Sequence, residues 1–402
     1  MSTAMTAAPT ATQTTDEALW LSYSQLTTHR RCPAAWRYKY IEHLEKVDPT
    51  DIPVERDFGT WWHALRAADS LERGRRHGSL QASPRTIKTV DGGPVIPVDQ
   101  ADVAAVVYAA EHWWQSLSPP IQEVWTDRLG AELTPRLLYA YDRWREEYEE
   151  EIATEHPLAV ELGWGRDMPG PTRVRLVGYV DEVYLDTKRN MVVVRDHKTS
   201  KALATQTVAD DMMDSQLQLY AWGATPAVRD WAVGPIRATA YDRMRSTAPR
   251  PPQLTLGGRL AMRGGEPSIG SSDLHTYVTW ARGEDGLGVP YPGTKKDGSG
   301  AGMYQLEQSV VERLSAPSAR SAWFQRTLTP LNANLIRAHL RAAIDSATDL
   351  AATRHRSLAT GEAARNLTSN CRYCDFVKLC RVQMVGGADG DFELADYSLR
   401  RR

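Results

Sequence analysis

Apolar and polar residues recur with a helical spacing over the first part of the chain, and with a spacing of two in its middle. We expect helices over residues 58–75 and 103–116, because apolar side chains there return every three or four positions. The period-two runs 158–163, 174–185 and 191–198 predict β-strands. The pattern thus changes from helices to strands after about residue 150.

The remainder of the chain mixes both patterns. A polar turn at 186–190 joins the last two strands, and a helix over 206–222 and a strand over 237–244 are expected next. Residues 246–302 are dense in Pro and Gly, which predicts long loops, and 309–360 return to helical spacing. These elements predict an α/β fold with a mixed sheet flanked by helices.

The expected ordered domain covers 19–385, with a helical insertion at 76–155 that includes a helix over 135–150. At its start, Ser22 is a suitable N-cap for a helix. We expect a disordered Ala- and Thr-rich tail over 1–18 and a C-terminal tail over 386–402.

Composition excludes few classes of function. The net charge of −2 rules out a uniformly basic nucleic-acid binder, but a local positive patch is enough to bind DNA. No apolar stretch is long enough to span a membrane, and the N-terminus lacks the features of a signal peptide. We therefore expect a cytoplasmic protein with reduced thiols and no membrane partner.

Two neighbouring strands carry the strongest chemical signal. Asp196 and Lys198 alternate with His197, so their side chains face the same side of the strand, and a hairpin would bring Asp181 beside them. Two carboxylates can bind Mg²⁺ or Mn²⁺, and the lysine can stabilise developing negative charge. His197 is expected to reach the metal only through its backbone carbonyl. An isolated Asp-x-Lys is more often a surface ion pair.

Further polar residues flank this pair of strands. Gly59 and His63 lie one helical turn apart, where the glycine would permit close packing and the imidazole could bind the metal. A hydrogen-bonded core histidine is the simpler interpretation. Gln216 and Tyr220 have the same spacing and could orient the lysine, or merely form an amphipathic helix. Glu161 is either a further carboxylate of the site or a surface residue.

All four cysteines fall in one early and three late positions: Cys32, Cys371, Cys374 and Cys380. Four thiolates can hold a [4Fe–4S] cluster or a zinc ion. Arg372, Lys378 and Arg381 lie among the late cysteines and suit contacts to a DNA backbone.

The order Gly-x-x-x-His, Gly-x-x-Asp, Asp-x-Lys, Gln-x-x-x-Tyr, after the opening residues 21–26 and 31–33, resembles the RecB-like branch of the PD-(D/E)xK nuclease superfamily. The cysteine arrangement is similar to the iron–sulfur variant in AddB-type and CRISPR-associated RecB-like nucleases. Val180 stands where the superfamily name has Pro, and His197 replaces the usual apolar residue.

The resemblance implies a restriction-endonuclease-like core with a cluster that staples the termini, closing residues 361–384 onto Cys32. It implies that His63, Asp181 and Asp196 bind metal, that Lys198 is catalytic, and that other residues support the site. These are Gln216 and Tyr220.

The resulting hypothesis is a stand-alone, metal-dependent exonuclease on single-stranded or end-processed DNA, in repair, recombination or phage DNA metabolism. A helicase or recombination partner would supply unwinding, because residues 288–295 lack the Gly-Lys-Ser/Thr ending of a P-loop. One alternative is a non-catalytic iron–sulfur subunit that binds DNA in a larger complex. Another is a zinc-stapled regulatory protein.

Overall fold

The structure is a computed structural model that describes residues 18–46, 52–169, 173–203, 208–252, 260, 262–263, 266–267, 269, 271–282, 289–291, 302–304, 308–320, 322–385 and 397–399. The chain divides into two compact units. The larger comprises Thr50–Leu162 and Val180–Leu331, and the smaller comprises Met1–Pro49, Gly163–Tyr179 and Asn332–Arg402.

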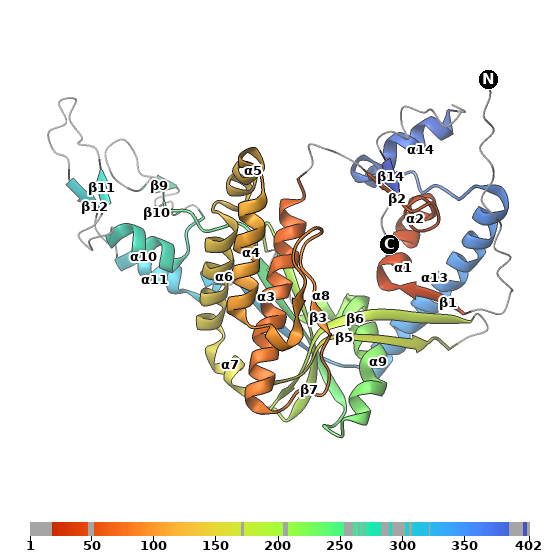
Figure 1. Cartoon of the computed structure of the whole chain (residues 1–402), viewed down its shortest axis with the longest axis horizontal. Coiled ribbons are helices and arrows are strands. Elements are labelled where there is room, and N and C mark those ends of the chain that lie inside the picture. Colours follow the sequence, from red (N-terminus) through yellow and green to blue (C-terminus); the bar gives the residue numbers. More distant parts are fainter. Residues whose placement is uncertain are drawn as a thin grey trace. The chain divides into compact units, whose positions relative to one another are not determined.

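A mixed sheet forms the centre of the larger unit (Figure 1). Its strand order is β6-β7-β8-β13, and β5 pairs with β6. Strand β7 pairs antiparallel with β6 and parallel with β8, while β8 and β13 are antiparallel. The bounds are β5 Glu155–Asp167, β6 Val174–Asp186, β7 Met191–Ser200, β8 Ile236–Arg245 and β13 Phe324–Pro330.

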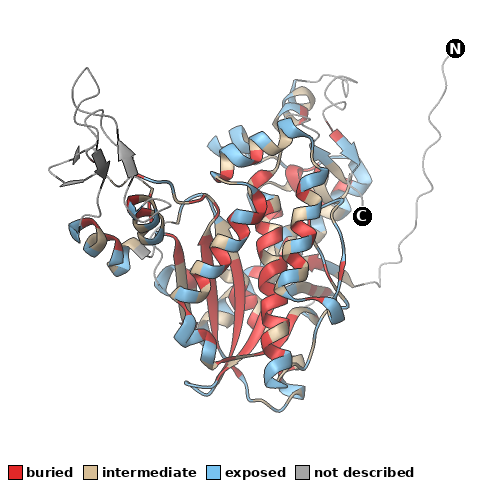
Figure 2. Ribbon diagram, turned by 60° about the vertical axis from the view of Figure 1, so that its left-hand side comes forward, coloured by how far each residue is buried: buried red, intermediate tan, exposed pale blue. Residues whose placement is uncertain are grey.

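The continuous valine run 192–194 explains the central position of β7. All three side chains are buried, as expected for a strand covered on both faces (Figure 2). The parallel step from β7 to β8 requires a crossover connection, which two helices supply. These are α8 Val208–Met213 and α9 Ser215–Asp230.

Helix α3, Val54–His77, carries the expected Gly59 and His63. Acidic residues occupy its first turn and basic residues its last turn, which matches the helix dipole. Gly78 ends it with a φ of 62°, a left-handed conformation that glycine adopts without strain. Its buried face joins the main hydrophobic core, which also contains Trp125 and Trp144.

The segment between α3 and β5 is mostly helical. It consists of β3 Thr86–Ile87, β4 Ile96–Pro97, the short 3₁₀ helix Val98–Gln100, α4 Val103–Ser116, α5 Pro119–Leu129, α6 Leu133–Glu147 and α7 Glu149–Thr154. Helix α5 was missed by the sequence analysis. Pro119 at its first turn and Gly130 after its end, with a φ of 80°, are the local signals for it.

Two expectations for the later part of this unit were wrong. Residues 246–302 contain a helix as well as short strands, and the helical pattern over 309–360 is interrupted by β13. Pairing with β8 selects the strand conformation there, a non-local contact that spacing alone does not reveal. The elements are β9 Met262–Arg263, β10 Glu266–Pro267, α10 Leu274–Arg282, β11 Val289–Tyr291, β12 Gly302–Tyr304, α11 Gln308–Ser315 and α12 Pro317–Arg320.

The smaller unit combines the two ends of the chain. Its elements are β1 Leu19–Ser22, α1 Tyr23–Arg31, α2 Pro33–Tyr40, β2 Leu44–Lys46, α13 Ala333–Thr360, the 3₁₀ helix Ser369–Tyr373, α14 Val377–Met384 and β14 Tyr397–Leu399. Ser22 caps α1 as predicted, accepting a hydrogen bond from the backbone N–H of Gln25 at 3.2 Å. Tyr38, Phe376 and Tyr397 pack in one small core.

The predicted tails fall largely outside the described residues: of 1–18 only residue 18 is described, and of 386–402 only Tyr397–Leu399. Among the described residues, no helix has both the length and the apolarity to cross a membrane.

Candidate active site

The predicted hairpin forms, and its pairing stops at the predicted site. Strands β6 and β7 pair from Asp186–Met191 as far as Glu182–Arg195. At the next position the Asp181 side chain replaces the partner strand, because its Oδ2 accepts the backbone N–H of His197 at 2.7 Å. The carboxylate is thereby fixed at the end of the paired region, on the side from which Asp196 projects.

Asp196 and Lys198 form an ion pair on β7, with 2.7 Å between Oδ2 and Nζ. Burial and the neighbouring Asp181 carboxylate raise the pKa of Asp196 to about 6. Burial alone would lower the pKa of Lys198, but the Asp196 carboxylate outweighs it and the net direction is upward. Two carboxylates placed this close favour a cation between them.

His63 reaches the same place from α3. Its Nδ1 lies 3.4 Å from Oδ2 of Asp181. Burial opposes protonation of His63, but Asp181 raises the pKa of the ring overall. The pKa of Asp181 is in turn held well below its usual range, since His63 and the His197 N–H outweigh the effect of burial.

Gly59 permits this approach of helix to strand. A Cβ atom at Gly59 would lie 2.8 Å from Oγ1 of Thr199, the residue after Lys198. The predicted role of Gly59 in close packing is confirmed, since any larger residue would force α3 or Thr199 to move.

Glu161 adds a third carboxylate to the surroundings. Its φ of 46°, within β5, is rare for a residue with a side chain. Burial and the nearby Asp181 raise the pKa of Glu161. Glu161, His63 and Lys198 all line a cavity of about 570 Å³, together with Lys88 of the insertion.

The family model of the PD-(D/E)XK nuclease superfamily matches residues 20–381. This chain belongs to the PD-(D/E)XK nuclease superfamily. Members of the superfamily are generally metal-dependent nucleases, and membership implies a DNA substrate. No match was found among curated proteins. The mixed sheet with flanking helices is consistent with the restriction-endonuclease-like fold of this superfamily.

Gln216 and Tyr220, which were expected to support the site, both lie on α9. Asp214 caps this helix, accepting the backbone N–H of Gln216 at 2.8 Å, and also accepts the Tyr241 hydroxyl at 2.6 Å. Burial raises the pKa of Tyr220, which hydrogen bonds with Gln216 and lies close enough to Asp196 and Lys198 to sense their charges. The structure therefore brings Gln216 and Tyr220 to the side of the sheet that carries Lys198.

His197 belongs to the other face of β7. Its ring is buried, contacts His63 edge-on at 6.0 Å between ring centroids, and lies 3.9 Å from Asp242. Burial and the Arg66 cation lower the pKa of His197 to about 3, so the imidazole is neutral. It therefore contributes packing behind the site.

Behind β7 lies a feature that the sequence analysis missed. Carboxylates and guanidinium groups alternate around a closed ring of ion pairs, each residue contacting the next. In order these are Glu155, Arg195, Glu182, Arg73, Asp69, Arg66, Asp242 and Arg326, which returns to Glu155. We call this set the charge ring.

The charge ring is electrically balanced, and all its members except the partly buried Arg326 are buried. Two neutral groups add to it: Tyr141 donates to Asp69 at 2.8 Å, and Ser70 donates to Glu182 at 2.8 Å. Arg195 and Glu182 are the residues next to Asp196 and Asp181 in the chain. The ring thus holds the two strands from behind where they carry the candidate metal ligands.

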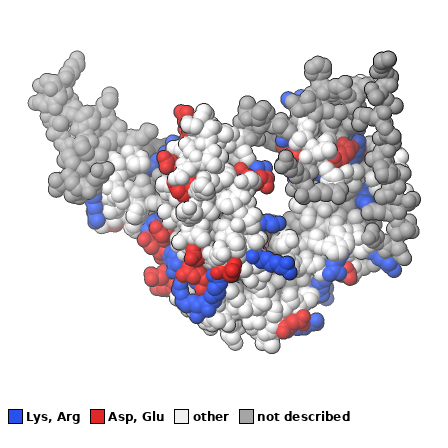
Figure 3. Space-filling view, viewed as in Figure 1, with Lys and Arg blue, Asp and Glu red and all other residues white. Residues whose placement is uncertain are grey.

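Charges outside the charge ring are distributed differently. On the face shown in Figure 3, acidic and basic side chains are interspersed near the foot of the larger unit, without a single-sign surface. This agrees with the net charge of −2 and leaves DNA binding to local groups.

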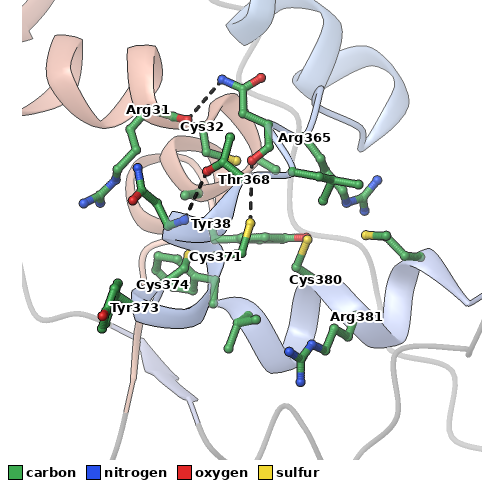
Figure 4. A pocket seen from close by; sticks show the side chains of 18 of the residues that line it. Arg31, Cys32, Tyr38, Arg365, Thr368, Cys371, Tyr373, Cys374, Cys380 and Arg381 are labelled. Carbon is green, nitrogen blue, oxygen red and sulfur yellow. Dashed lines mark hydrogen bonds between the residues drawn. The ribbon is translucent and has the colours of Figure 1, made fainter.

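The four cysteines line one cavity of about 760 Å³ within the smaller unit (Figure 4). Cys32 joins α1 to α2, and the other three belong to the segment 369–384. Burial raises the pKa of Cys374, and the nearby Cys32 adds to the shift. Asn366 links the two segments by donating to the backbone carbonyl of Arg31 at 3.0 Å.

Neither candidate centre is a complete ligand cage. In the part of the chain that the structure describes, no group of three or more His, Cys, Asp or Glu side chains is arranged to hold a metal ion. For Mg²⁺ the donor set still fits, because this ion keeps several waters and needs only one or two carboxylates. For a cluster, the convergence of all four thiols on one cavity is the observation that fits.

Proposed function

We propose that this chain is a metal-dependent deoxyribonuclease that hydrolyses phosphodiester bonds at the Asp181–Asp196–Lys198 site. The observation that carries the proposal is the position of these three side chains where β6 and β7 cease to pair, with Lys198 lining a cavity. Superfamily membership supports the same chemistry.

Asp181 and Asp196 would hold Mg²⁺ or Mn²⁺, with His63 and the main chain at His197 as further ligands. When bound, such an ion activates water and offsets charge on the phosphate. Lys198 would stabilise negative charge that develops on the phosphate oxygens, and its side chain, partly exposed and paired with Asp196, supports this role. Gln216 and Tyr220 would keep Lys198 oriented from α9.

We further propose the RecB-like assignment: an exonuclease that acts alone on single-stranded or end-processed DNA in repair, recombination or phage DNA metabolism. The order of motifs along the chain supports it, as does the placement of His63, Gln216 and Tyr220 around Lys198.

A cleavage assay with end-labelled DNA tests the catalytic proposal. We expect cleavage that requires Mg²⁺ or Mn²⁺ and is lost in Lys198→Ala. Lys201→Ala is a matched control, because Lys201 pairs with Glu55, which is not one of the proposed metal ligands. Cleavage by Lys198→Ala at the parent rate would refute the site. Binding without cleavage under any divalent ion would favour a non-catalytic subunit.

For the cysteines we propose a [4Fe–4S] cluster with a structural role, held by Cys32, Cys371, Cys374 and Cys380. A bound cluster would join the start of α2 to the C-terminal segment, and Arg31, Arg365 and Arg381, which line the cavity, would offset its negative charge. Iron and sulfide analysis of protein purified without oxygen tests this. If the protein contained one equivalent of zinc and no iron, the four cysteines would instead form a zinc site.

A further inference from the structure

In the smaller unit, β1 extends the same sheet by pairing with the first part of β6, and this part of the sheet, with the adjoining end of β5, has two contrasting faces. Leu21, Leu176 and Trp164 are buried on the inner face. Gly178 makes room there, because a Cβ atom at this position would lie 2.9 Å from the Trp164 ring. The outer face carries Trp20 and, from β6, residues 175, 177 and 179.

Tyr179 is the most exposed aromatic residue of this outer face, with 71% of its surface accessible. Its ring lies against the backbone of β5, since a Cβ atom at Gly163 would be 3.1 Å from Cε1 of Tyr179. The glycine therefore lets the ring rest on the strand while most of it faces outward.

Arg175 is held in a comparable way beside it. Its Nη2 donates to the backbone carbonyl of Gly165 at 2.9 Å, and its Nη1 donates to Asp167 at 3.1 Å. The guanidinium lies 5.5 Å from the centroid of the Trp20 ring, and Trp20 is 63% exposed. The register pairs Trp20 directly with Arg175 across β1 and β6.

Two exposed aromatic rings and an anchored guanidinium thus share one sheet face. Residues 163–179 carry three arginines (Arg166, Arg173 and Arg175) against one acid (Asp167), a net charge of +2. Exposed rings beside positive charge are the features with which proteins stack unpaired bases and hold the phosphates between them.

We infer that this face, defined by Trp20, Arg175 and Tyr179, binds an unpaired DNA strand by stacking its bases. We call it the stacking face. The inference rests on the proposed function, since it assigns a path to the DNA substrate. Tyr179 precedes the candidate metal ligand Asp181 by two residues in β6, so the stacking face and the catalytic site share a strand.

The stacking face favours a base over a protein side chain as its occupant. A protein partner would need a larger apolar area than two exposed rings provide. A single DNA strand has binding groups for both features of this face, because its bases can stack on the rings and its phosphates can pair with the arginines.

The test measures binding rather than cleavage, with the full chain carrying Lys198→Ala. One labelled oligothymidylate of about 12 nucleotides is compared with an abasic chain of equal length, which keeps the phosphates and lacks the bases. We expect oligothymidylate to bind at least about tenfold more tightly. Equal affinity for the two chains would overturn the inference.

Single substitutions then test whether the bases contact Tyr179 and Trp20. Tyr179→Ala is expected to weaken oligothymidylate binding about 5- to 100-fold, to leave the abasic chain unaffected, and to be rescued in Tyr179→Phe. Trp20→Ala provides an independent second variant should Tyr179→Ala fold poorly. Loss of affinity for both chains alike in these variants, with the fold intact by circular dichroism, would contradict stacking. Failure of the catalytic proposal would instead appear as cleavage by Lys198→Ala.

Discussion

The backbone N–H of His197 donates to Oδ2 of Asp181, at the position where β6 no longer offers β7 a backbone partner. Asp181 therefore has two roles in this arrangement, one in holding the strands together and one as a candidate metal ligand. The two roles can be separated by substitution.

We predict that Asp181→Asn and Asp181→Ala both lose nuclease activity, by about three orders of magnitude, because neither supplies a charged metal ligand. The amide oxygen of Asn can still accept the His197 N–H, whereas Ala cannot. The unfolding midpoint should therefore fall further in Asp181→Ala than in Asp181→Asn. Equal midpoints would show that the hydrogen bond does not stabilise the strands.

The contact between Gly59 and Thr199 gives a second prediction. In Gly59→Ala the new Cβ meets Oγ1 of Thr199 at 2.8 Å, so α3 and His63 should shift from the sheet. We expect lower activity with little loss of stability, since alanine gains about 1 kcal/mol over glycine within a helix. Removing the hydroxyl in Gly59→Ala/Thr199→Ala should restore activity. A double variant as impaired as the single one would exclude this contact as the cause.

The charge ring predicts a large effect from one small substitution. In Glu182→Gln the Arg73 and Arg195 cations lose a buried partner, which should lower the free energy of unfolding by about 3–5 kcal/mol. The exposed pair Glu72–Arg76 on α3 is the matched control. Glu72→Gln should change the same quantity by less than about 1 kcal/mol in urea denaturation. Similar losses in both variants would mean that the ring confers no special stability.

The same ring makes stability depend on pH. Burial alone would raise the pKa of Asp69, but Arg73 and Arg66 outweigh it and the net pKa is lowered. A carboxyl group with a lowered pKa stabilises the fold above its unfolded pKa of about 3.9 and loses this contribution as the pH falls through its folded pKa.

We therefore expect the urea midpoint to decrease from about pH 5 downward, and to decrease less steeply in Asp69→Asn. Asp102→Asn, at the exposed cap of α4, should follow the slope of the parent protein. An unchanged slope in Asp69→Asn would remove Asp69 from the acid response.

The parts of the site that sequence could predict are those set by short-range geometry. Asp196 and Lys198 share a face because side chains alternate along a strand, and Gly59 lies one turn from His63 on a helix. The turn at 186–190 determines which residues of β6 and β7 meet, so Asp181 could be placed beside them.

The remaining features could not be predicted because they depend on contacts between residues that are distant in the sequence. Glu155 and Arg326 are far apart in sequence and each has an ordinary surface-like context, so nothing local indicates that they meet. Strand β13 could not be predicted for the same reason, since its conformation depends on pairing with the distant strand β8. The face of β1, β5 and β6 was also not anticipated, because Gly163 and Gly165 have meaning only beside the side chains that lie over them.

The closed charge ring also constrains how this chain can evolve. Every member contacts two members of opposite sign, so replacing any one of them leaves each of its two neighbours with one partner in place of two. Substitutions that keep the ring balanced would have to replace at least one acid and a neighbouring base together. We therefore expect these eight positions, which bracket the nuclease residues on β6 and β7, to change in concert among related sequences.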